Sequence, residues 1–141
     1  MSKVVSLRLK DEQVERLQRA ARRLGRTPSE AAALLLEEGL RQREFPFVEF
    51  RDSPLGRQAY LQGTRLAVWQ VVALARDYGD DVARTAAHLE IPRLQVAAAL
   101  RYAEAYPAEI EAAIADNASA AADLARLIPG LEVVAVDAAA P

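Results

Sequence analysis

The sequence predicts a mainly α protein, in which a short N-terminal strand precedes two helices and a β-hairpin precedes several more. Three observations predict this class. Apolar and polar residues alternate over residues 4–9, which is the period of a half-buried strand. Apolar residues recur at helical spacing over residues 11–43 and again after residue 68, and two strand-like runs flank a turn at residues 52–56. We expect residues 1–44 to form one domain, residues 45–115 a second, and residues 116–141 an acidic, alanine-rich tail.

Composition limits the class of protein. The 141 residues carry a net charge of −2, but this charge is +4 in residues 1–43, zero in residues 44–103 and −6 in residues 104–141. A basic head and an acidic tail indicate two different partners, although uneven scatter of charge is the simpler explanation. The absence of cysteine excludes disulfides and thiolate metal sites. Because no run approaches the roughly 18 apolar residues of a membrane span, we expect a soluble, cytoplasmic protein without a membrane partner.

The first domain shows an ordered series of signals. A helix is expected over residues 11–24, and Gly25 can take the left-handed conformation that ends it. Thr27, Pro28 and Glu30 fit a capping box at the start of a second helix that runs to about Arg43. The apolar faces of the two helices are expected to bury Val14, Leu17, Ala21 and Leu24 in the first, and Leu35, Leu36 and Leu40 in the second.

A segment this small cannot bury its apolar faces alone, so we expect it to fold as an intertwined homodimer. The order strand, helix, glycine, capped helix resembles the ribbon-helix-helix family, in which two strands pair into a ribbon that enters the DNA major groove. Lys10 departs from the Pro or Ser usual in that family. If the odd-numbered residues of the strand face the core, the even-numbered residues point into the groove and can contact bases. Lysines at the ends of the strand and the start of the second helix would contact phosphates. The expected DNA contacts are Lys3, Val4, Ser6, Arg8, Lys10, Thr27 and Ser29. The alternative is that the strand only dimerises the protein and Arg8 is a solvated charge.

The second domain is expected to begin with a hairpin around residues 52–56 and to continue with helices over residues 68–78, 82–89, 92–105 and 108–128. Either Asp80 or Asp81 can cap the second of these helices. Ala86, Glu90 and Val96 have the spacing of a helix-turn-helix, although Glu90 stands where glycine is usual. The expected core is Val68, Val71, Val72, Ala75, Val82, Ala83, Ala86, Leu89, Ile91, Val96, Leu100 and Ala103.

The helix after this turn carries few groups that could read DNA. Arg65, Arg93, Gln95 and Arg101 are candidates for a second surface that binds DNA or protein. The intervening Ala97, Ala98 and Ala99 form a smooth face, which favours protein contact over base reading.

Residues 47–114 resemble a small bacterial family called domain of unknown function 433. The most specific motif is Gly63-Thr64-Arg65 with Val68-Trp69. Members are similar to antitoxins of the VapB type, whose genes often lie beside PIN-domain ribonuclease toxins. A strand-to-helix turn, in which Arg65 pairs with Asp52 or Asp77, explains the glycine motif as well as a functional role does. Trp69 is expected to be a core residue.

The acidic tail is a candidate toxin-binding segment. Ala118, Ala121, Leu124, Ala125 and Ile128 form an apolar stripe, residues 131–136 are strand-like, and Arg126 could pair with nuclease carboxylates. We therefore expect toxin contacts at Leu124, Arg126, Ile128, Leu131 and Val133. A disordered or self-packed tail is the alternative.

Catalysis is poorly supported, since His88 is the only histidine and the sequence shows no metal site, cofactor motif or phosphate loop. The sequence favours a non-enzymatic type II antitoxin, which as a dimer, or a higher oligomer, binds operator DNA and neutralises a PIN-domain-like toxin. The alternatives are a stand-alone transcriptional regulator without a toxin and an oligomerisation or scaffold protein.

Overall fold

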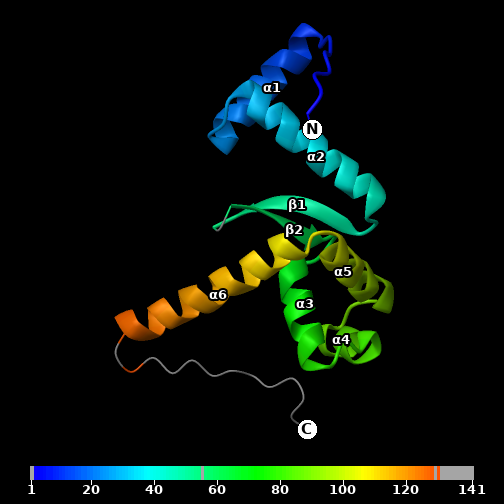
Figure 1. Cartoon of the computed structure of the whole chain (residues 1–141), viewed down its shortest axis with the longest axis vertical. Helices are drawn as coiled ribbons and strands as arrows, with labels where there is room; N and C mark the ends of the chain where they lie inside the picture. Colours follow the sequence, from blue (N-terminus) through cyan, green and yellow to red (C-terminus); the bar gives the residue numbers. More distant parts are fainter. Residues whose placement is uncertain (1, 55, 129, 131–141) are drawn as a thin grey trace. The chain divides into compact units, whose positions relative to one another are not determined.

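The computed structural model describes residues 2–54, 56–128 and 130, and this part of the chain is mainly helical with one small antiparallel sheet (Figure 1). The chain divides into two compact units, Met1–Arg41 and Gln42–Pro141. The strand-like segment expected at residues 131–136, and with it the toxin contacts expected at Leu131 and Val133, lies outside the described residues.

Helix α1 (Asp11–Leu24) has the bounds expected from the sequence. Gly25 ends it with a φ of 65°, in the left-handed region that glycine adopts without strain. At its start, the Lys10 N–H donates to the Gln13 side-chain oxygen at 2.9 Å. A lysine side chain has no acceptor atom, so only the reciprocal half of a capping box forms, in which the Gln13 side chain accepts the N–H of the N-cap residue.

Helix α2 (Pro28–Glu44) begins with half of the expected capping box, because Thr27 Oγ1 accepts a hydrogen bond from the Glu30 N–H at 3.2 Å. The burial of Leu35, Leu36 and Leu40, which was expected in a dimer, does not occur within the single chain. All three side chains are exposed, and Leu36 keeps 60% of its surface in contact with solvent. Two helices from one chain do not offer enough surface to cover these leucines.

Residues 2–10, which precede α1, form no strand within the single chain; the expected pairing is between two chains, and a single chain does not test it. The expected inward and outward faces are not distinguished, since Val4, Val5 and Leu7 are all exposed. A strand requires a neighbouring strand for its backbone hydrogen bonds, and the described part of this chain provides none next to this segment.

The second unit contains the expected hairpin. Strands β1 (Val48–Ser53) and β2 (Gly56–Leu61) pair antiparallel, with Val48 opposite Leu61 and Ser53 opposite Gly56. Val48, Ala59 and Leu61 are buried, so one face of the hairpin faces the helices of the same unit.

Four helices follow the hairpin: α3 (Val68–Asp77), α4 (Val82–Leu89), α5 (Arg93–Ala105) and α6 (Pro107–Leu127). Helix α3 contacts the other three, and α6 runs away from them (Figure 1, yellow to orange). Asp81 caps α4 by accepting a hydrogen bond from the Arg84 N–H at 3.0 Å. Helix α6 is continuous across residues 115 and 116, where the sequence suggested a domain boundary.

The turn between α4 and α5 has a left-handed residue where a helix-turn-helix usually has glycine. Glu90 adopts a φ of 56° and a ψ of 42°, and the flanking Ala86 and Val96 are buried. The glutamate therefore takes the conformation that glycine normally supplies, at some cost in backbone strain.

An aromatic cluster closes the core of this unit. The Tyr102 side chain is fully buried, and its ring packs edge-on against the rings of Phe45 and Phe50, with 5.4 Å and 6.4 Å between ring centroids. The centroid of the Tyr106 ring lies 4.9 Å from that of Tyr102. Sequence periodicity identified many core positions in α3–α5 but missed the members that join the hairpin and α6 to them. The buried cluster is Phe45, Val48, Ala59, Leu61, Val68, Val71, Val72, Ala86, Val96, Ala99, Tyr102 and Ile110.

Candidate functional site

The N-terminal arm, residues 2–10, carries five of the seven side chains expected to contact DNA. Lys3, Val4, Ser6, Arg8 and Lys10 are all exposed. The charged groups and the hydroxyl group among them are therefore exposed, but no strand of the described residues lies beside the arm.

The start of α2 offers fewer free backbone N–H groups than expected. Thr27 Oγ1 takes the Glu30 N–H, and Pro28 has no N–H to offer. Ser29 is exposed in this first turn. Any phosphate contact here would therefore depend on Ser29 rather than on a full set of helix N-terminal groups.

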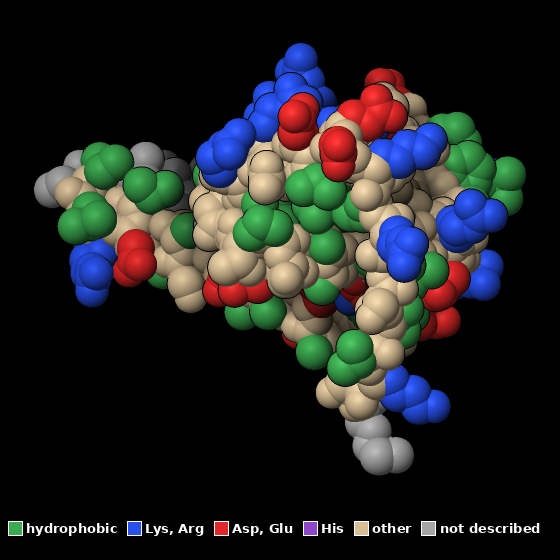
Figure 2. Space-filling view, turned by 90° about the horizontal axis from the view of Figure 1, so that it is seen from above, with side chains coloured by type: hydrophobic (Ala, Val, Ile, Leu, Met, Phe, Trp, Pro, Cys, Tyr) green, Lys and Arg blue, Asp and Glu red, His purple; other side chains and the backbone are tan. Residues whose placement is uncertain are grey.

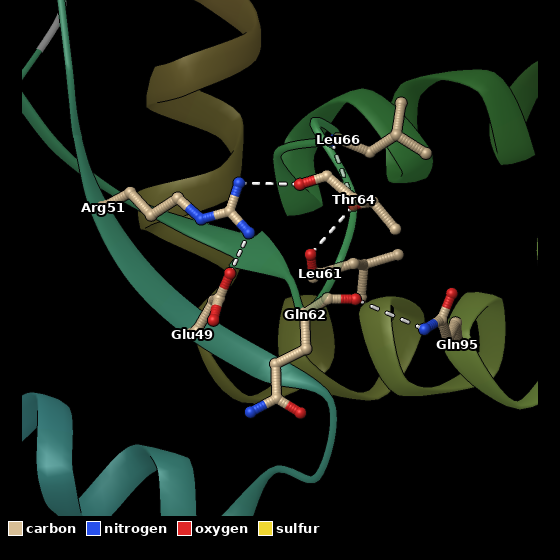
Figure 3. Close-up of polar contacts among 7 residues, drawn as sticks. All are labelled: Glu49, Arg51, Leu61, Gln62, Thr64, Leu66 and Gln95. Atoms are coloured by element: carbon tan, nitrogen blue, oxygen red, sulfur yellow. Dashed lines mark hydrogen bonds and ion pairs between the residues drawn. The ribbon is translucent and has the colours of Figure 1, made fainter.

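The Gly63-Thr64-Arg65 motif lies in a loop that several hydrogen bonds fix in place (Figure 3). Arg51, on β1, donates to the Thr64 carbonyl oxygen at 2.7 Å and pairs with Glu49. Thr64 Oγ1 donates to the Leu61 carbonyl at 2.9 Å and accepts from the Leu66 N–H at 3.0 Å. The threonine thus braces the loop rather than capping α3.

The same loop is tied to α5 from the other side. Gln95 Nε2 donates to the Gln62 carbonyl oxygen at 3.5 Å (Figure 3), and Gly63 has a φ of 72°. Arg65 is exposed and forms no ion pair with a described residue. The expected pairing with Asp52 is wrong, because Asp52 pairs with Arg57 at 3.2 Å, and no pairing with Asp77 forms. The result is a rigid loop with one free guanidinium group.

The four residues expected to form a second surface have different surroundings in the structure. Gln95 supports the loop that carries Arg65. Arg101 instead lies over the Phe45 ring, 5.7 Å from its centroid, and Arg93 is exposed in the first turn of α5. These residues do not form a row of free donors, as base reading would require.

The exposed face of α5 borders an apolar pocket. It has a volume of about 210 Å³ and is lined by residues 45–47 together with Leu94, Ala97, Ala98 and Arg101. Leu94 is 70% exposed at its edge. We call this site the α5 pocket. The alanine face was the one feature of the sequence that indicated it, because that face favoured protein contact.

The distal half of α6 carries exposed apolar side chains, which Figure 2 shows at the left of the view. Leu124, Leu127 and Ile128 are all about half exposed or more. Arg126 is not a free cation, because it pairs with Asp123 of the same helix at 3.3 Å. Exposed pairs of this kind contribute little, about 0–1 kcal/mol, so a partner could displace Asp123 readily.

Two titratable groups among the described residues have clearly shifted pKa values. The clear pKa shifts belong to an exposed pair: the hydrogen bond from Arg76 lowers the pKa of Glu111, and the same bond raises the pKa of Arg76. His88 Nδ1 lies 2.8 Å from the Tyr78 hydroxyl, and the Arg84 guanidinium group lies over the Tyr78 ring, 4.5 Å from its centroid. No cluster of three metal-binding side chains occurs in the part of the chain that is described.

None of the described helices combines the length and apolar character that a membrane span requires. Comparisons of the chain with protein-family models, with curated proteins and with solved structures found no match.

Proposed function

We propose that this chain is the antitoxin of a toxin-antitoxin pair, which binds operator DNA as a homodimer through a ribbon-helix-helix and neutralises a PIN-domain-like ribonuclease through α6 and the residues after it. The observation that carries the proposal is the exposed N-terminal arm. Its alternating apolar residues are not covered by the residues that the structure describes, since Val5 is 80% and Leu7 75% exposed. A second copy of the same arm would cover them by forming a two-stranded ribbon.

The energetics of that pairing can be bounded. Burying an exposed Val or Leu side chain is worth roughly 1.5–3 kcal/mol, so Val5, Leu7 and Leu36 from both copies would supply on the order of 10 kcal/mol. Association costs about 4–15 kcal/mol. Because gain and cost are similar in size, the dimer should be concentration dependent and sensitive to one polar substitution.

Sedimentation of the full chain tests the dimer. We expect a dimer at micromolar concentration and a monomer for Leu7→Asp, while Ser6→Asp, which adds the same charge on the neighbouring position, should still dimerise. A wild-type chain that remains monomeric at these concentrations would overturn the ribbon.

In the dimer, Ser6 and Arg8 would meet base edges, and Lys3 and Lys10 would meet phosphates. DNA retardation with the region upstream of the gene, at several salt concentrations, tests these roles. Arg8→Ala should reduce discrimination between operator and random DNA by roughly 1–3 kcal/mol. Arg16→Ala, an exposed arginine of α1, is the matched charge control. Equal losses on operator and random DNA for Arg8→Ala would contradict a base-reading role.

The toxin-binding half of the proposal rests on the apolar residues of distal α6. Leu124 and Ile128 lie four residues apart and could enter a hydrophobic groove, with Arg126 directed to acidic residues of the toxin. Co-expression with the product of the adjacent reading frame tests this. Leu124→Asp should abolish co-purification, whereas Ser119→Asp, away from the stripe, should not. Unchanged toxin inhibition by Arg126→Ala would remove the role of that arginine.

A stand-alone regulator would make a different prediction. Residues 44–114 would bind DNA by themselves, and no neighbouring gene product would co-purify. The apolar surface of α5 beside the pocket favours the antitoxin, because it offers DNA few hydrogen-bonding groups.

A further inference from the structure

The α5 pocket has the size and lining of a site for aliphatic side chains. Its volume is about 210 Å³, and an apolar cavity of about 150 Å³ is already large enough to hold benzene. Two phenylalanines, a proline, a leucine and two alanines line it, and Arg101 is the one charged residue among the lining.

The backbone at the edge of this pocket is strained. Phe47 has a φ of 69°, in the left-handed region, which costs a non-glycine residue roughly 1–2 kcal/mol. A hydrogen bond from the Gln62 N–H to the Phe47 carbonyl oxygen, 2.8 Å long, holds this conformation. Strained residues that their surroundings hold in place tend to occur at ligand-binding sites, and here the strained residue is an aromatic one that is 38% exposed.

We infer that the α5 pocket binds the apolar segment of residues 131–136 from a second copy of this chain. The segment, LEVVAV, supplies Leu131, Val133 and Val136 for an apolar site. It carries Glu132 and is followed by Asp137, without any basic residue after position 126. These acids complement Arg101, which forms no ion pair with any described residue.

The number of residues after α6 indicates that the segment in the pocket comes from a second copy and not from the same chain. Helix α6 begins beside the pocket, because the ring of Tyr106 lies 5.7 Å from that of Phe45. Its 21 residues then extend about 30 Å away at 1.5 Å per residue. From Leu127, fully extended chain reaches back only about 14 Å at Leu131 and about 32 Å at Val136. The segment as a whole therefore cannot occupy its own pocket, but it can occupy that of another protomer.

This exchange requires no toxin and adds a second contact to the chain's self-association. It also places the same residues in two competing roles: a toxin that binds Leu131 and Val133 would have to withdraw the segment from the pocket. The antitoxin proposal and the exchange can each fail without the other.

Disulfide trapping tests the inference, since the full-length chain contains no cysteine. Chains with Ala97→Cys, in the pocket, are mixed with chains carrying Val133→Cys and oxidised mildly. The control replaces Ala97→Cys by Ala87→Cys, an exposed alanine of α4. We expect the mixed disulfide to form at least fivefold faster with position 97 than with position 87, and adding Arg101→Glu should remove most of that difference.

Two outcomes would overturn the inference. Equal rates at positions 97 and 87 would show that the segment has no preference for the pocket. A disulfide that forms within one chain, when Ala97→Cys and Val133→Cys are combined and the protein is diluted, would show that the chain fills its own pocket. Leu94→Cys provides a second pocket position, and Trp69 fluorescence verifies that each variant is folded.

Discussion

Replacing Tyr102 by alanine should test how the second unit is held together. Tyr102 is the largest fully buried side chain among the described residues. Its ring contacts Phe45, Phe50 and Tyr106, and its hydroxyl donates a hydrogen bond to the Glu109 carboxylate at 2.6 Å. The side chain therefore joins α5 to β1, to α6 and to the segment before the hairpin.

The expected loss can be estimated from these contacts. Truncating a buried aromatic residue to alanine costs about 3–5 kcal/mol in unfolding free energy, which is a large part of the 5–15 kcal/mol typical of a domain. Tyr102→Phe keeps the ring and removes only the hydroxyl. Because Glu109 is exposed, that change should cost about 0.5–1.5 kcal/mol, below the range for a buried charged hydrogen bond.

Urea denaturation followed by the fluorescence of Trp69 measures both losses. Trp69 is the only tryptophan of the chain and packs against the core of the second unit, so it reports on that unit. We expect Tyr102→Ala to lose at least twice as much stability as Tyr102→Phe. If the two variants lost the same amount, the ring contacts would contribute nothing beyond the hydroxyl, and the account of this core would be refuted.

Three further predictions concern polar groups. Arg51→Ala should speed hydrogen exchange at the amides of residues 62–66, because it removes the bond to the Thr64 carbonyl that braces the loop; exchange measured by NMR at unchanged rates would contradict this. Glu111→Gln should lower stability at neutral pH. The pKa of Glu111 is depressed in the folded state by Arg76, so its contribution is present above its ordinary pKa of 4.5 and is lost as the pH falls through the lower, folded value. Denaturation at pH 7 and at pH 3 should show the difference between variant and wild type shrinking in acid, and a constant difference would argue against the pair. Glu90→Gly should raise the unfolding free energy by about 0.5–1 kcal/mol, since glycine takes the left-handed conformation without strain; thermal unfolding checks the sign.

Local signals in the sequence were sufficient to place the helices and the hairpin, but not the N-terminal segment, in which no strand forms within the single chain. The bounds of α1, the position of the hairpin turn around residues 52–56 and the start of α5 after Pro92 follow from periodicity, glycine and proline. These features depend on backbone preferences within a few residues, which a sequence displays directly. At Glu90 the helix-turn-helix spacing predicted the turn correctly, although the residue at that position is not the usual glycine.

Side-chain partners could not be read in the same way. The sequence suggested Arg65 as the arginine that pairs near the glycine motif, whereas the structure uses Arg51, 13 residues from the Thr64 carbonyl that it binds. It suggested Arg126 as a free cation, whereas Asp123 lies beside it. Which of several arginines meets a given acceptor depends on distances between elements, and these are set by packing.

The order of elements, the charge asymmetry and the exposed alternation of the N-terminal arm were determined by the sequence alone, because each depends on neighbouring residues. The aromatic core around Tyr102, the braced loop at Thr64 and the α5 pocket were decided by the tertiary structure. The aromatic core joins the segment around Phe45 and β1 to α5, the loop at Thr64 is tied to β1 and to α5, and the pocket joins residues 45–47 to α5; the parts joined to α5 lie roughly 30 to 60 positions from it in the chain. Only the packing of the hairpin against the helices makes them neighbours.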